Sequence, residues 1–212
     1  MTTYLYTGIA PTSFSLAAQP NTAILTSAIT QAEQSIIRPG GRFSLTVTWA
    51  NVHGASLNAV LGYLDQLNGS EHRAQFRLWI KNHGAYGGTP LTDGAQTAGS
   101  NILAVRGASL SITNWAKAGD LISVASSASN TYGLHRVTAD ADSDGTGDVS
   151  LSVFPDLHRA YPDGRQVVIG IPNSNWVMTG AYDVSHDASN LLNNGDHRAT
   201  VTASFLQDIA TA

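Results

Sequence analysis

The sequence predicts a mainly β protein with one packed α-helix, and three patterns support this prediction. Apolar and polar residues alternate in several runs, which is the period of a half-buried strand. Clusters of Gly, Pro, Asn and Asp separate these runs and indicate turns. A single segment, residues 55–68, carries apolar residues at helical spacing. We therefore expect an antiparallel sheet or sandwich domain that contains the helix, and a small inserted β-barrel or sandwich.

Composition narrows the class of protein. The 212 residues, 42% of them hydrophobic, are enough for one large domain or two small ones. The net charge of −4 provides no basic surface for nucleic acid or an anionic membrane. The absence of cysteine excludes disulfides, thiol catalysis and zinc–thiolate sites. We expect no signal peptide and no membrane span, because neither pattern is present.

A β-hairpin is predicted over residues 23–52, with its turn at Arg38-Pro39-Gly40-Gly41. In its second arm the apolar residues Phe43, Leu45, Val47 and Trp49 alternate with Ser44, Thr46 and Thr48. One face of this arm is therefore apolar and needs a cover.

The predicted helix, residues 55–68, supplies that cover. Its apolar stripe consists of Leu57, Val60, Leu61, Leu64 and Leu67, and Gly69 follows as a C-terminal stop. Residues 74–81 alternate again, and we expect them to pair with the same sheet.

The remainder of the chain contains more strand patterns. Residues 82–100 are rich in Gly, Pro, Asn and Asp and indicate a long loop or a domain boundary. The predicted strands are 102–106, 121–125, 132–137, 149–154, 166–171, 176–184 and 197–206, the last of them closing the first sheet. We assign residues 1–85 and 175–212 to the first domain and residues 95–172 to the inserted one.

The acidic stretch 139–148, ADADSDGTGD, resembles the start of a helix–loop–helix calcium loop. Position twelve of such a loop should be Glu but is Leu151, and the flanking residues have strand patterns. The stretch therefore indicates a hairpin tip whose Asp and Gly residues supply turn geometry. An ion held by Asp140, Asp142, Asp144 and Asp148 is the alternative.

Catalytic patterns are absent from the sequence. The seven histidines form no HExxH pair, and residues 84–88 lack the Lys-Ser/Thr of a phosphate loop. Residues 183–187, DVSHD, hold Ser, His and Asp as neighbours, whereas a triad draws its members from separate elements. We predict no enzyme activity and no catalytic, cofactor-binding or metal-binding residues; a hydrolase that depends on His186 is the weakest alternative.

Aromatic side chains offer one further kind of site. Trp49 and Trp79 lie in alternating strands, where packing is their expected role. Trp115 and Tyr132 of the inserted domain are the residues that would face a sugar if the protein were a carbohydrate-binding module.

Over residues 94–172 the chain resembles the distal-tail and tail-tip ring proteins of long-tailed bacteriophages. The resemblance rests on GAQTAGSNILAVRGAS from residue 94, AGDLISVA at 118–125, and the segment TYGLHRV, the acidic turn and VSLSVFPDL that follows. Leu67-Asn68-Gly69 and Phe76-Arg77-Leu78 resemble the ring-forming domain of these proteins. Pro155-Asp156-Leu157-His158-Arg159 departs from the Pro-Pro-Leu-Arg of related chains.

This resemblance implies a structural virion protein: a homo-oligomeric ring, commonly of six copies, between the tail tube and the baseplate or tail tip. Its partners would be the tube protein and the baseplate hub or tail-fibre proteins, in a tail assembled in the host cytoplasm. We expect the hairpin of residues 23–52 and the helix of residues 55–68 to close the ring, with the inserted domain at the periphery. The alternative function is a carbohydrate-binding β module that contacts the host surface.

Overall fold

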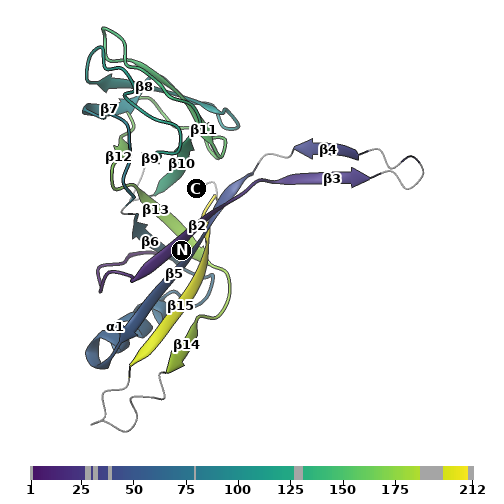
Figure 1. Cartoon of the computed structure of the whole chain (residues 1–212), viewed down its shortest axis with the longest axis vertical. Helices are drawn as coiled ribbons and strands as arrows, with labels where there is room; N and C mark the ends of the chain where they lie inside the picture. Colours follow the sequence, from purple (N-terminus) through teal and green to yellow (C-terminus); the bar gives the residue numbers. More distant parts are fainter. Residues whose placement is uncertain are drawn as a thin grey trace. The chain divides into compact units, whose positions relative to one another are not determined.

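The structure, a computed structural model, describes residues 2–26, 30, 33–37, 40–78, 80–126, 131–186 and 198–209 (Figure 1). These residues form one helix and two larger sheets, so the prediction of a mainly β fold with a packed helix is confirmed. The elements are β1 Thr3–Leu5, β2 Ser13–Gln19, β3 Thr22–Thr26, β4 Glu33–Ile37, β5 Arg42–Val52, α1 Gly54–Gln66, β6 Arg73–Arg77, β7 Gly88–Thr92, β8 Ile102–Ala108, β9 Leu121–Ala125, β10 Tyr132–Val137, β11 Val149–Phe154, β12 Val167–Ile169, β13 Asn173–Met178, β14 Asp183–His186 and β15 Ala199–Gln207.

The chain divides into two compact units. The first consists of residues 1–17, 43–77 and 175–208, and the second of residues 18–42, 78–174 and 209–212. Residues 18–42, 78–85 and 209–212, which we had expected in the first domain, fall in the second unit.

The sheet of the first unit has the strand order β1-β6-β13-β15-β5-β2, and β14 also pairs with β15. β1 pairs with β6 in parallel, so the sheet is mixed rather than purely antiparallel as predicted. β15 pairs with both β5 and β13, which places the last strand inside this sheet.

The single strand predicted over residues 176–184 is wrong, because the chain leaves the sheet between β13 and β14. Both strands pair with β15, with Met178 opposite Phe205 and Asp183 opposite Thr202. From Met178 to Asp183 the chain advances five residues, whereas β15 advances three from Phe205 to Thr202. The extra residues, in a segment that includes Gly180, bulge out of the sheet.

The predicted hairpin of residues 23–52 is also wrong in its pairing. β4 pairs with β3, and β5 pairs with β15 and lies beside β2. Of the predicted turn, Arg38 and Pro39 lie outside the described residues. The predicted alternation is confirmed, since Phe43, Leu45, Val47 and Trp49 are buried and Ser44, Thr46 and Thr48 are half-buried. A strand's pattern thus fixes which face is buried but does not select its partner.

An aromatic cluster joins α1 to the first sheet. Tyr63 of α1 lies 4.8 Å from Tyr6 and 6.2 Å from Phe76 between ring centroids, and its hydroxyl donates to Tyr4 O. Tyr6 in turn contacts Trp49 of β5 at 5.5 Å. Val60, Leu64 and Leu67 are fully buried, so the helix covers the apolar face as predicted. None of the described helical residues forms a segment long and apolar enough to span a membrane.

The sheet of the second unit is a nearly closed antiparallel barrel with the order β12-β9-β10-β11-β8-β7. A bridge between Leu91 and Gln166 links its two end strands. The strands predicted at 121–125, 132–137 and 149–154 match β9, β10 and β11. β7 was missed inside the predicted loop 82–100, because Gly88 and Pro90 have the composition of a turn. An end strand tolerates both.

Candidate functional site

The edge strand β2 is the most unusual surface of the first unit. It ends the strand order beside β5, and all of its residues except Leu16 are exposed. Its sequence, SFSLAAQ, contains no charge and no proline. Soluble proteins usually place charged residues or proline on an exposed edge strand, because the free N–H and C=O groups of that strand can pair with strands of other chains. β2 therefore has the chemistry of an association edge.

The chain continues from β2 into a two-stranded ribbon, β3 and β4, which form a sheet of their own. Their register runs from Thr22 opposite Ile37 to Thr26 opposite Glu33. Figure 1 shows the two strands side by side. Glu33 is the one charged residue between positions 13 and 37. Because an isolated two-stranded ribbon is only marginally stable in water, this ribbon gains from a partner.

The outer face of α1 is also weakly charged. Ala55, Asn58, Ala59 and Gly62 are exposed, and Asp65 is the only charged residue of the helix. The Asp65 carboxylate accepts a hydrogen bond from the Tyr182 hydroxyl at 2.8 Å, which ties the end of α1 to the segment before β14. Small, uncharged side chains allow another chain to approach this face closely.

The acidic stretch 139–148 is held by its own carboxylates. Asp140 accepts from Ala118 N at 2.9 Å, and Asp142 accepts from Asn114 N at 2.6 Å. Asp144 accepts from the N–H groups of Thr146 and Asp148, both at 2.8 Å. These bonds lower the pKa of Asp144.

The stretch connects β10 to β11 but is more than a hairpin tip. Ala141 exchanges two backbone hydrogen bonds with Ala116, each 3.0 Å long, so the stretch docks on the loop of residues 109–118. Among the described residues, no group of three or more His, Cys, Asp or Glu side chains is arranged to hold a metal ion. The described geometry therefore uses the aspartates as acceptors for backbone N–H groups.

Asp120 organises the start of β9. It is 2% exposed, and its carboxylate accepts from His83 N at 2.7 Å, Gly84 N at 2.9 Å, Lys117 N at 3.0 Å and the Tyr86 hydroxyl at 2.7 Å. Burial by itself would raise the pKa of Asp120, but these hydrogen bonds outweigh it and lower the pKa. The carboxylate thus joins two loop segments, residues 83–86 and the loop before β9, to the barrel.

His135 lies inside the barrel unit with no exposed surface. Its Nδ1 is 2.8 Å from Pro155 O, and because a carbonyl only accepts, Nδ1 carries the proton and Nε2 does not. Nε2 is buried and has no hydrogen-bond partner among the described residues. Burial, with smaller effects from His158 and Arg159, lowers the pKa of His135 to about 3. The ring is therefore neutral and structural at ordinary pH.

Gly133 makes room for this buried group. A Cβ at position 133 would lie 2.0 Å from Tyr161 Oη and 3.1 Å from His135 Nε2. Tyr161 is 1% exposed, so its ring cannot swing into solvent to relieve the overlap.

Gly133→Ala is accordingly expected to lower the free energy of unfolding by about 1–3 kcal/mol through overpacking. Urea unfolding followed by fluorescence measures the change. Tyr161→Phe removes the hydroxyl oxygen that a new methyl group would meet, so most of the loss should be recovered in the double variant. An equal loss in the Tyr161→Phe background would show that the two side chains do not collide.

The residues of the hydrolase alternative do not form a triad in the described structure. Ser185 and His186 are neighbouring exposed residues of β14, and Asp187 lies outside the described residues. His197 also lies outside them.

The two aromatic residues named for the carbohydrate-binding alternative, Trp115 and Tyr132, differ in how far they are exposed. The interpretation of Trp115 as a ligand-facing residue is wrong, because Trp115 is fully buried. Its ring packs edge-on against Tyr86 at 5.0 Å, and its Nε1 donates to Gly87 O at 3.1 Å. Tyr132 is half-buried at the start of β10. Trp49 is fully buried as expected, and Trp79 lies outside the described residues.

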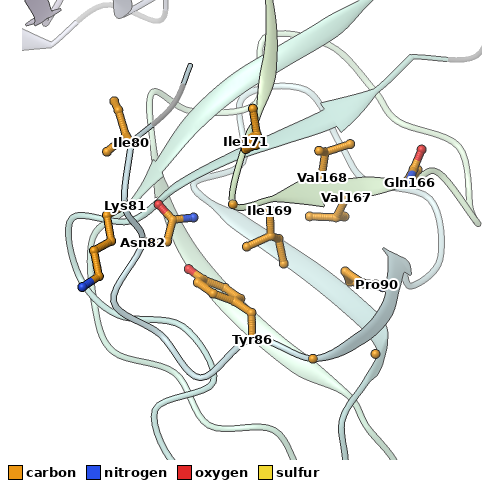
Figure 2. A pocket seen from close by; sticks show the side chains of 13 residues that line it. Ile80, Lys81, Asn82, Tyr86, Pro90, Gln166, Val167, Val168, Ile169 and Ile171 are labelled. Atoms are coloured by element: carbon orange, nitrogen blue, oxygen red, sulfur yellow. The ribbon is translucent and has the colours of Figure 1, made fainter. Parts of the chain in front are cut away.

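The second unit also has an opening in its barrel wall, with a volume of about 560 Å³. Its lining comes from residues 80–82, from 86–88 and Pro90, and from residues 166–171. Figure 2 shows Tyr86, Ile169 and Pro90 around the hollow and Lys81 at its rim. Residues 86–88 and Pro90 come from the start of β7 and the loop before it, and residues 166–171 come from β12 and its flanking residues.

Sequence reasoning missed β2, Asp120 and the group around His135. The alternation of Phe14 and Leu16 with serine was a usable signal for β2. His135 and Tyr161 are far apart in sequence, and no local pattern predicts the contact between their rings.

A search of protein-family models finds no match to this chain, and a search of curated proteins finds none either.

Proposed function

We propose that this protein assembles into a homo-oligomeric ring of six copies that joins a phage tail tube to the baseplate or tail tip. The proposal combines the sequence resemblance with the exposed surfaces of β2, the β3–β4 ribbon and α1. The observation that carries it is the uncharged, exposed edge strand β2, which continues into the two-stranded ribbon β3–β4. Both features are more stable when another chain covers them.

A ring follows if β2 and the ribbon of one copy meet a different surface of the next. Such a heterologous contact closes into a ring when the rotation from one copy to the next is a full turn divided by a whole number. The exposed face of α1, which carries Asp65 as its only charge, is a candidate for the opposing surface. On this proposal the tube protein and the baseplate hub or fibre proteins bind the two faces of the ring, in a tail assembled in the host cytoplasm.

The carbohydrate-binding alternative has lost one of its two aromatic residues, since Trp115 is buried. Tyr86 of the barrel opening is half-buried and is already bonded to Asp120 through its hydroxyl. A sugar site built on a single aromatic face has less support than the assembly surface, so the ring remains the proposed function.

The ring predicts a multimer of fixed mass, which mass photometry of the purified chain measures. Ala17→Lys places one charge per copy on the exposed edge β2, and we expect this variant to shift the population from rings toward monomers. Ser150→Lys is the matched control, because Ser150 is exposed on β11, a strand with neighbours on both sides. A wild-type chain that stays monomeric at its highest soluble concentration would contradict the proposal.

A further inference from the structure

The barrel of the second unit is closed at one end of its seam and open at the other. The bridge between Leu91 and Gln166 and the bonds from Thr92 N to Arg165 O at 2.7 Å and from Gly164 N to Thr92 O at 3.0 Å join the end of β7 to the residues just before β12. Beyond these bonds lies the opening of about 560 Å³ (Figure 2). Pro90 stands on the β7 side and has no N–H to offer across the gap. The wall is therefore interrupted along β12.

β12 presents a free backbone edge to this opening. Ala125 N donates to Gln166 O at 2.9 Å, and Val168 is the register partner of Ser123. Hydrogen-bonded pairs alternate along an antiparallel ladder, so the N–H and C=O of Ile169 point away from β9. β12 is the last strand in the order, and the opening lies on that side. An added strand can form a hydrogen-bonded pair with Ile169.

The opening also has a floor that suits an aliphatic side chain. Tyr86 and Ile169 both line it and both pack against the apolar core of the barrel. Ile171, at the end of the lining segment, is 45% exposed. An apolar side chain that enters here would cover surface that now faces water, which is favourable.

The positive charge of Lys81 at the rim favours an acidic ligand. Lys81 is the only charged residue of the lining, and it is one of two lysines in a chain with a net charge of −4. It is exposed, and no ion pair joins it to any part of the chain that the structure describes. A carboxylate on the occupant would complement it, whereas the acidic chain as a whole offers little other attraction for an anion.

We propose that this opening binds an extended, acidic peptide segment of a partner protein. The segment adds to β12 as a strand, pairs with Ile169, places an aliphatic side chain beside Tyr86 and brings a carboxylate to Lys81. This is strand addition with one specificity pocket and one charge contact. The proposal is independent of ring formation, because none of the residues that line the opening belongs to β2, to the β3–β4 ribbon or to α1.

The test uses the full-length chain and two fluorescein-labelled hexapeptides, TELVLT-amide and its charge-reversed partner TKLVLT-amide, with binding followed by anisotropy. We expect saturable binding of the first peptide. Lys81→Glu should weaken it about two- to fivefold, the range of an exposed ion pair, and should improve binding of the second peptide. Arg198→Glu, which reverses the charge of an exposed residue of the first unit outside the opening, is the matched control and should change neither affinity.

A third probe separates strand addition from simple apolar contact. A version of the first peptide methylated on the backbone nitrogens of its central residues keeps the side chains but loses the N–H donors, and we expect its affinity to fall at least about fivefold. Three results would overturn the proposal: no saturable binding of the first peptide, no loss on methylation, or equal effects of Lys81→Glu and Arg198→Glu.

Discussion

Asp120→Ala is expected to lower the free energy of unfolding by about 3–5 kcal/mol, the cost of breaking a buried charged network. The substitution leaves three backbone N–H groups and the Tyr86 hydroxyl without the acceptor that they share. Asp120 is 2% exposed, so these donors lose a partner in a buried environment. Urea unfolding gives the change in free energy. Because Tyr86 contacts Trp115, near-ultraviolet circular dichroism reports the local effect.

Asp163→Ala is the matched control for this experiment. Asp163 also bonds a backbone N–H, that of Gly94 at 2.9 Å, and pairs with Arg106 at 3.1 Å, but its side chain is 52% exposed. An exposed pair contributes about 0–1 kcal/mol, so this variant should remain close to wild type. If the two variants lost similar amounts of stability, the burial of the Asp120 network would not be what makes it important.

The second large effect is the loss of stability in mild acid through His135. Its pKa is lowered to about 3 in the folded chain, because burial, His158 and Arg159 disfavour a charge on the ring. An unfolded histidine titrates near 6.5, so the unfolded state binds the proton first as the pH falls. The stabilisation is fully present above pH 6.5 and is lost progressively toward pH 3. Its total is up to about 5 kcal/mol at 1.36 kcal/mol for each pKa unit.

His135→Gln isolates this effect, since glutamine does not titrate and can still donate to Pro155 O. Between pH 7 and pH 4, the wild type should lose about 3 kcal/mol more stability than the variant. The buried carboxylate of Asp120, whose pKa is lowered, titrates below this window. Parallel stability curves for the two proteins would show that His135 does not control the acid response.

Local patterns predicted the individual elements well where one face is buried. The alternation in β5 and the stripe on α1 each match the burial in the structure, because water and core impose the same period on sequence and structure. β7 was missed because it lies at the end of its sheet, where Gly88 and Pro90 replace the regular apolar pattern. β2, also an end strand, was missed although Phe14 and Leu16 alternate with serine in its first half.

Pairing was predicted less well than the elements were. The strand before the turn at residues 38–41 was expected to pair with β5, but β4 pairs with β3 and β5 pairs with β15 from the other end of the chain. Partner choice depends on contacts between residues far apart in sequence, which a local period does not encode. The same limit concealed the meeting of His135 with Tyr161 and the free edge of β12.

The sequence by itself determined the mainly β class, the position of the helix and the low charge of the segment between residues 13 and 37. Of the aspartates that it predicted as turn formers, Asp144 accepts from the nearby N–H groups of Thr146 and Asp148, as a local turn requires. Asp140 and Asp142 instead accept from the distant loop of residues 109–118. The tertiary structure alone decided that β2 is an edge, that β3 and β4 form a ribbon of their own, and that the barrel is open beside Ile169. These features arise from which strand lies next to which, and that order is fixed only when the whole sheet forms.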